Sequence, residues 1–250
     1  MTAAIEMRGL RVAFADGLAA DVDLEVTAGE IVVLLGPSGC GKSTVLRALA
    51  GLLPVAGGTV RPSDGPAHRR GIAMVFQEDA LLPWRTARRN VEYALELRGV
   101  PRRERGDEAL ELLEQVGLTG FADHLPGRLS GGMRQRVQLA RTLAARPKIM
   151  LMDEPFGALD AQTRADMQRL LVSVWERHRT TILFVTHDVD EALLIADRIV
   201  LLTPRPATVD RIFEVPRPRA PGTRFEPAFA RMRYEILAAL GARTERPEPV

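Results

Sequence analysis

Short apolar runs alternate along the chain with longer stretches in which apolar residues recur every three or four positions. The runs cover residues 31–36, 71–77, 149–154, 181–188 and 198–203. Runs of this length are typical of strands buried on both faces, and the amphipathic stretches between them are typical of helices. The alternation therefore predicts an α/β core built on a parallel sheet.

Two regions depart from this alternation. Residues 5–14 and 20–26 alternate apolar with polar positions, which predicts an antiparallel β subdomain near the N-terminus. Strand signals then stop, and residues 90–100 and 102–118 have the periodicity of amphipathic helices. We therefore expect an α-helical subdomain inserted at about residues 84–135.

The composition changes after residue 204, where prolines become frequent. In one stretch of this tail, four apolar residues share a helical face: Phe229, Met232, Ile236 and Leu240. The sequence thus predicts a main domain over residues 1–204 and a proline-rich extension over residues 205–250. The extension carries one amphipathic helix, whose apolar face we expect to dock on the core.

Composition limits the classes of protein to consider. A chain of 250 residues that is 46% hydrophobic can bury a full core. Its 34 basic and 32 acidic residues nearly balance, which gives no support for a nucleic-acid partner. The single cysteine, Cys40, fits a reducing compartment. No apolar run approaches the roughly 18–20 residues that span a bilayer, so we expect a cytoplasmic chain whose membrane partners, if any, are other proteins.

Residues 36–44 read GPSGCGKST and fit the phosphate-binding P-loop pattern. They follow an apolar strand and precede a helical run, as the pattern requires. Its members are Gly36, Pro37, Ser38, Gly39, Cys40, Gly41, Lys42, Ser43 and Thr44. Glycines let backbone N–H groups surround phosphates, Lys42 would reach the β- and γ-phosphates, and the Ser43 hydroxyl would bind Mg²⁺. The alternative is a glycine-rich turn without a ligand.

Three more predicted strands end in polar side chains. Asp153 and Glu154 end one apolar run, Gln77 ends another, and His187 ends a third. Taken singly, each has a simpler explanation as a helix cap or a loop residue. Because parallel sheets place ligands at the carboxyl ends of their strands, the four ends together predict a site for phosphoryl transfer to water. Asp153 suits the shell of Mg²⁺, and Glu154 suits the group that polarises the water.

Residues 129–136 read LSGGMRQR and open another helix with glycines. Ser130 is a good N-cap, and Gly131 and Gly132 would leave N–H groups at the helix N-terminus open to an anion. An ordinary capped helix with a flexible entrance is the alternative.

The order of these motifs resembles that of the ATP-binding cassette (ABC) family over roughly residues 5–205. The resemblance implies a P-loop NTPase core with a parallel sheet, an N-terminal antiparallel β subdomain and an inserted α-helical subdomain. It also implies that the chain binds and hydrolyses ATP with Mg²⁺. Two copies would close head to tail, so that Ser130 and Gly132 of one copy touch the γ-phosphate held by the other.

The resemblance also assigns a role to each matching position. The expected catalytic residues are Glu154, His187 and Gln77, and the expected Mg²⁺ ligands are Ser43, Gln77 and Asp153. Besides residues 36–44, the expected nucleotide contacts are Phe14, Ser130, Gly131, Gly132 and Asp160. Phe14 occupies the place of the aromatic residue that stacks on adenine. Asp160 resembles the residue that contacts the facing copy, and His187 resembles the sensor of the γ-phosphate.

Residues 76–84, FQEDALLPW, and residues 153–164, DEPFGALDAQTR, are similar to the ATPases of nitrate, sulfonate and taurine importers. This resemblance implies a peripheral subunit on the cytoplasmic face of the cell membrane. It would energise uptake of a small solute through separate permease subunits. An extracytoplasmic substrate-binding protein would deliver the solute to these subunits.

The stretch around Trp84 allows two interpretations. Leu81, Leu82 and Trp84 form an apolar cluster that suits either the docking of a membrane subunit or packing within the core. The chain departs from the expected apolar pattern directly afterwards, where three arginines follow: Arg85, Arg88 and Arg89.

Two other functions compete with transport. One is a soluble ABC-type ATPase acting on ribosomes or DNA. Such proteins usually have tandem cassettes or a long coiled-coil insertion, and this sequence has neither. The other is a nucleotide-binding scaffold without turnover, which the intact Glu154 and His187 disfavour.

Overall fold

The computed structural model describes residues 3–14, 17–62, 71–78, 80–216 and 226–244 of the 250-residue chain. The chain forms two compact units. The terminal unit comprises residues 1–69 and 181–250, and the middle unit comprises residues 70–180. Both units combine strands with helices, which confirms the predicted α/β class.

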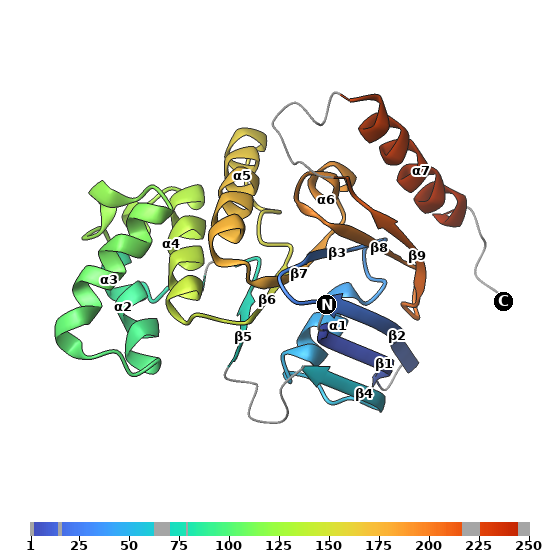
Figure 1. Cartoon of the computed structure of the whole chain (residues 1–250), viewed down its shortest axis with the longest axis horizontal. Helices are drawn as coiled ribbons and strands as arrows, with labels where there is room; N and C mark the ends of the chain where they lie inside the picture. Colours follow the sequence, from blue (N-terminus) through green and yellow to red (C-terminus); the bar gives the residue numbers. More distant parts are fainter. Residues whose placement is uncertain (1–2, 15–16, 63–70, 79, 217–225, 245–250) are drawn as a thin grey trace. The chain divides into compact units, whose positions relative to one another are not determined.

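The terminal unit contains an antiparallel sheet (Figure 1). β1 (Ala3–Phe14) pairs with β2 (Gly17–Thr27) on one side and with β4 (Gly57–Pro62) on the other. Alternate residues along much of β1 and β2 are buried, as in strands with one solvated face. The predicted antiparallel subdomain is therefore confirmed. β4 was not predicted, because its two leading glycines weaken the strand signal.

A second sheet of the terminal unit is mostly parallel. β3 (Ile31–Leu35) lies between β7 (Thr181–Thr186) and β8 (Arg198–Leu202) and runs parallel to both. Every residue of β3 and β7 is buried, which explains their continuous apolar sequences. β9 (Val209–Glu214) joins β8 in the antiparallel sense. It is mostly exposed, so its sequence lacks the apolar run that revealed the other strands.

The described part of the terminal unit has three helices: α1 (Lys42–Leu49), α6 (Val189–Ile195) and α7 (Pro227–Thr244). α7 lies beside α6 (Figure 1), and Arg233 Nε donates to Asp190 Oδ1 at 2.6 Å. Ile236 of α7 is fully buried, and the other residues of its predicted apolar face are half-buried: Phe229, Met232 and Leu240. The helix therefore turns the predicted face inward.

The middle unit contains one parallel pair of strands and four α-helices among its described residues. β5 (Ile72–Val75) pairs with β6 (Ile149–Asp153). The helices are α2 (Ala87–Leu97), α3 (Arg102–Gln115), α4 (Gly131–Ala144) and α5 (Ala161–His178), with short 3₁₀ turns at Thr119–Phe121 and Pro126–Arg128. α2 and α3 confirm the two amphipathic helices expected from the sequence.

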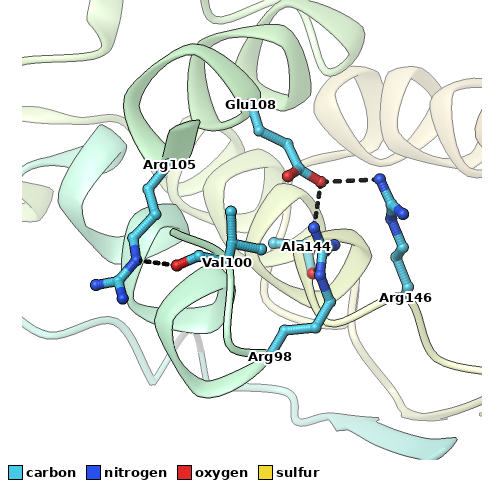
Figure 2. A network of polar contacts seen from close by, with 6 residues as sticks. All are labelled: Arg98, Val100, Arg105, Glu108, Ala144 and Arg146. Carbon is cyan, nitrogen blue, oxygen red and sulfur yellow. Dashed lines mark hydrogen bonds and ion pairs between the residues drawn. The ribbon is translucent and has the colours of Figure 1, made fainter. Parts of the chain in front are cut away.

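A polar network joins the C-terminal ends of α2 and α4 to the middle of α3 (Figure 2). Glu108 of α3 accepts hydrogen bonds from Arg98, directly after α2, and from Arg146, shortly after α4. Arg98 also donates to the carbonyl oxygen of Ala144 at 2.6 Å. Because one carboxylate pairs with two guanidinium groups, Glu108 links the ends of α2 and α4 to α3.

Candidate functional site

The P-loop of the terminal unit has a backbone that only glycine adopts without strain. β3 ends at Leu35, the chain turns through residues 36–41, and α1 begins at Lys42. Gly39 and Gly41 have φ of +77° and +117°, in the region that disfavours other residues. A Cβ atom added at Gly41 would lie 2.7 Å from the carbonyl oxygen of Ala19. The loop conformation therefore depends on these glycines.

Lys42 is held against its own loop. Its side chain is buried, with 4% of the residue exposed, and Nζ donates to the carbonyl oxygens of Gly36 at 2.7 Å and Pro37 at 2.8 Å. A positive charge is thus fixed where the loop meets the N-terminus of α1, whose dipole also favours an anion. This arrangement fits a phosphate chain, as the sequence predicts.

The other P-loop residues differ in exposure. Ser38 and Gly39 are exposed at the tip, whereas Ser43 and Thr44 are half-buried in the first turn of α1. Burial raises the pKa of the Cys40 thiol, so this residue stays protonated and packs as a small apolar side chain.

Two further candidates belong to the terminal unit. His187 directly follows β7, and Thr186 of β7 pairs with Leu35 of β3, so His187 and the P-loop leave the same edge of a parallel strand pair. His187 is exposed, and the next residue, Asp188, caps α6. Phe14 ends β1 and is 46% exposed, which leaves ring surface open for stacking.

In the middle unit, the carboxylates and Gln77 leave one edge of the β5–β6 pair. Val75 pairs with Met152, so Gln77 and Glu154 each follow the paired residues by two positions. Asp153 is buried and Glu154 is half-buried. A Cβ atom added at Gly157 would lie 3.4 Å from Gln77 Nε2 and 3.9 Å from Glu154 Oε2, so both side chains reach the same place.

Glu154 has an unusual backbone. Its φ of +44° lies in the left-handed region, which residues other than glycine rarely occupy. Such strain is concentrated at functional sites, where the surrounding structure holds it in place. The backbone therefore marks Glu154 as a functional candidate independently of its sequence motif.

Ser130 caps α4, the helix that the LSGG motif opens. Its hydroxyl accepts a hydrogen bond from the N–H of Met133 at 3.2 Å, and the residue is exposed. Gly131 and Gly132 form the first turn of the helix. A Cβ atom added at Gly132 would lie 2.4 Å from Cγ2 of Thr163, so this glycine also permits the close approach of α4 and α5. The structure thus confirms Ser130 as a helix cap, and the contact of this motif with an anion stays a prediction.

Asp160 caps α5. Its Oδ1 accepts from the N–H groups of Gln162 and Thr163 at 3.1 and 3.0 Å, and its Oδ2 accepts from the Thr163 hydroxyl at 2.6 Å. The hydrogen bond from this hydroxyl lowers the pKa of the exposed Asp160 carboxyl. The structure gives Asp160 a capping role that the resemblance did not include.

Sequence reasoning missed three polar side chains of α4: Gln135, Gln138 and Arg141. They donate hydrogen bonds to the backbone carbonyl oxygens of four residues: Phe76, Gln77, Glu78 and Ala80. These polar residues of α4 recur every three positions and so share one side of the helix, which was a detectable signal, because a buried glutamine requires partners.

A family model described as ABC transporter matches residues 19–157, more than half of the chain. The chain belongs to the ABC transporter family. The cassette includes the P-loop, the LSGG helix and both carboxylates within the matched range. In this family the chain is an ATP-binding subunit, and it hydrolyses ATP.

Relatives of this ABC cassette include two taurine import ATP-binding proteins, both named TauB. The protein from Rhizobium johnstonii is 46% identical over 230 residues, which cover 88% of this chain and 87% of the relative. The protein from Yersinia pestis is 48% identical over 193 residues, which cover 76% and 75%. The similarity to the taurine branch that the sequence motifs indicated is therefore confirmed.

A solved ABC structure supports the fold and the reaction. The ATP-binding cassette MJ0796, dimeric and bound to ADP and Pi after hydrolysis, is 34% identical. Its TM-score is 0.72, and the match covers 85% of this chain and 99% of that cassette. Among the helices described here, none has the length and apolarity to cross a membrane.

Proposed function

We propose that this cassette energises import of a small solute of the taurine type through separate permease subunits. A substrate-binding protein would deliver the solute to these subunits. The observation that carries the proposal is 46% identity to a taurine import ATP-binding protein along 88% of the chain. The cassette would act on the cytoplasmic face of the membrane as a peripheral subunit.

The proposed nucleotide site follows the roles that the family motifs assign to each residue. Lys42 binds the β- and γ-phosphates, and Phe14 stacks on the adenine. The Ser43 hydroxyl, the Gln77 amide oxygen and the Asp153 carboxylate would hold Mg²⁺, which would supply positive charge against the phosphates. These three groups offer oxygen ligands, which Mg²⁺ prefers, and the buried Asp153 at the end of β6 supports the assignment.

Glu154 is the proposed residue that orients and polarises the attacking water. Its strained backbone and its proximity to Gln77 around Gly157 support this role. His187, at the edge where the P-loop also begins, is the proposed sensor of the γ-phosphate.

A second copy completes the site in this proposal. Ser130, which is exposed at the N-terminus of α4, would face the γ-phosphate held by the other copy together with Gly131 and Gly132. The exposed Asp160 contacts that copy as well. The dimeric state of the relative MJ0796 supports a pair.

The proposed docking site for a permease is the loop that carries Trp84. This side chain is 72% exposed, although large aromatic residues are usually buried, and such residues anchor protein interfaces. Leu81 is buried and Leu82 is half-buried, so these two residues contribute to packing, whereas Trp84 is available for docking.

Hydrogen bonds to Asn90 hold the loop that carries Trp84 in place. Asn90 is fully buried, and its Oδ1 accepts from the N–H of Leu82 at 2.8 Å. Its Nδ2 donates to the carbonyl oxygens of Leu82, Arg85 and Thr86 at 3.0 to 3.2 Å. A loop held in place loses little entropy on binding, which suits the docking of a short helix from a membrane subunit.

The docking proposal predicts a difference between two equally exposed residues. Trp84→Ala should leave the melting temperature unchanged and reduce recovery of the cassette with the membrane fraction. Leu97→Ala is the matched control, because Leu97 is 73% exposed at the far end of α2. Equal recovery of both variants would refute the docking role of Trp84.

The transport proposal is tested by uptake of labelled taurine in a host whose gene for this chain has been deleted. The native chain should restore uptake, and Glu154→Gln should not, since its turnover should fall by about 10²–10⁴-fold. Purified Glu154→Gln should still bind ATP. If the native chain hydrolyses ATP but no taurine enters, the assignment of a taurine-type solute is wrong.

A further inference from the structure

The loop after β5 is bonded to α4 through side chains. The carbonyl oxygen of Gln77 accepts from Gln135 Nε2 at 3.1 Å, and that of Ala80 accepts from Arg141 Nη1 at 2.9 Å. Between them, Gln138 Nε2 donates to Phe76 at 3.4 Å and to Glu78 at 3.2 Å. One face of α4 therefore fixes the backbone on both sides of Gln77.

Gln138 is an unusual residue for this position. It is only 2% exposed, and its Oε1 is buried without a hydrogen-bond partner among the described residues. A buried acceptor without a donor is unfavourable, so the amide contributes less to stability than an amide with both groups bonded. An apolar side chain of the same length would avoid this cost. Stability alone therefore does not explain a glutamine here.

The bonds of Gln138 constrain a side chain that lies elsewhere. The Nε2 group donates to the carbonyl oxygens of Phe76 and Glu78, the residues before and after Gln77. These hydrogen bonds restrain the direction in which the Gln77 side chain leaves the backbone. The Gln77 amide in turn lies near Gly157 together with the Glu154 carboxylate. A shift of the 76–78 backbone would carry the Gln77 amide away from that place.

We propose that Gln138 and Gln135 are positioning residues for Gln77. They act through the backbone of residues 76–78 and link Gln77 to the helix that begins at Ser130. This inference rests on the proposed function, in which Gln77 binds Mg²⁺ and α4 faces the other copy. A shift of α4 would therefore move the Gln77 amide, and a shift of Gln77 would in turn move α4.

The test compares three variants with the native chain. Gln138→Met and Gln135→Met keep length and remove the hydrogen bonds to the loop. Thr142→Val is the control, because Thr142 is buried on the same helix and its hydroxyl donates to the Gln138 carbonyl within α4. The measurements are kcat, KM for ATP, the Mg²⁺ concentration for half-maximal turnover, the melting temperature, and hydrogen exchange of the segment from residue 76 to 80 without nucleotide.

Gln138→Met should keep its melting temperature, because the carbonyl groups of Phe76 and Glu78 belong to exposed residues that water can reach. Hydrogen exchange of the loop should become faster. The half-maximal Mg²⁺ concentration should rise or kcat should fall by roughly 10- to 100-fold, as for other residues that position metal ligands. KM for ATP should stay the same, and Thr142→Val should match the native chain in kcat and exchange.

Gln77→Ala separates failure of this inference from failure of the proposed function. If Gln77→Ala leaves turnover and its Mg²⁺ dependence unchanged, the proposed role of Gln77 is wrong and the inference fails with it. If Gln77→Ala impairs turnover but Gln138→Met changes neither turnover nor loop exchange, only the inference fails. A Gln138→Met variant that loses stability but keeps native kinetics would also overturn it.

Discussion

Two helices of this cassette begin with glycine-rich segments, and they use glycine for different reasons. α1 follows the P-loop, and α4 follows the LSGG motif. In the P-loop, Gly39 and Gly41 adopt positive φ values that other residues avoid. Neither Gly131 nor Gly132 at the start of α4 has a positive φ.

The difference extends to how each helix start is completed. The P-loop carries its own cation, since Lys42 is buried against the carbonyl groups of Gly36 and Pro37. α4 has only its Ser130 cap, and its second glycine is needed where α5 approaches. The first segment contains every group that a phosphate site requires, whereas the second contains part of one. This contrast suits a motif that completes the site of another copy.

The first prediction concerns the cation of the P-loop. Lys42→Ala should weaken ATP binding by roughly 10²–10⁴-fold, because it removes two hydrogen bonds to charged groups, each contributing about 1.5–3 kcal/mol. Fluorescence titration with an ATP analogue measures the loss. Lys148→Ala, at the only other lysine of the chain, should bind with native affinity. Equal affinity of both variants would remove the P-loop from nucleotide binding.

The second prediction concerns the start of α4. Ser130→Arg should leave ATP binding by the monomer unchanged and lower turnover by about 10²-fold, the effect of losing a donor to developing charge. A cation is also unfavourable at a helix N-terminus. Turnover is measured at a concentration where the native chain forms dimers.

Ser130→Ala is the control for the lost helix cap. Both substitutions remove the hydrogen bond to Met133, and each should cost about 1 kcal/mol of stability. Only arginine adds bulk and charge at the proposed contact with the other copy. If the two variants have the same turnover, the cap alone accounts for the effect and α4 has no part in the partner's site.

The comparison also shows what the sequence could reveal. The P-loop was predictable because its function depends on local backbone conformation, and glycine at fixed positions records that requirement. β3, β6, β7 and β8 were predictable because burial on both faces leaves long apolar runs, and the half-buried β5 is apolar as well. Edge strands β4 and β9 carry no such record, since few of their residues are buried.

The roles of Gly132, Asp160 and Gln138 were not predictable in the same way. The contact of Gly132 with Thr163 and the hydrogen bonds of Gln138 join segments that lie far apart in the chain, so no local pattern encodes them. An aspartate directly before a helix is a detectable N-cap signal, and Asp160 is such a residue. The family resemblance instead assigns it a contact with the other copy. The division into a main domain and a C-terminal extension stays a prediction.

The third prediction tests the packing role of Gly132, and its expected effect is the smallest. Gly132→Ala should lower the free energy of unfolding by about 1–3 kcal/mol, the usual cost of an overpacked contact. The added Cβ atom would lie 2.4 Å from Thr163 Cγ2. Thermal or urea denaturation measures the change. Gly131→Ala is the control, because its Cβ atom would meet Leu159 at an ordinary 3.7 Å.

A compensating substitution decides whether the contact with Thr163 is the cause. Thr163→Ser removes Cγ2 and keeps the hydroxyl that donates to Asp160. The double variant Gly132→Ala with Thr163→Ser should therefore recover most of the stability lost by Gly132→Ala alone. Additive losses in the double variant would show that α4 and α5 are not in conflict there. The glycine would then be explained by ligand contact alone, as in the P-loop, and the contrast between the two helix starts would disappear.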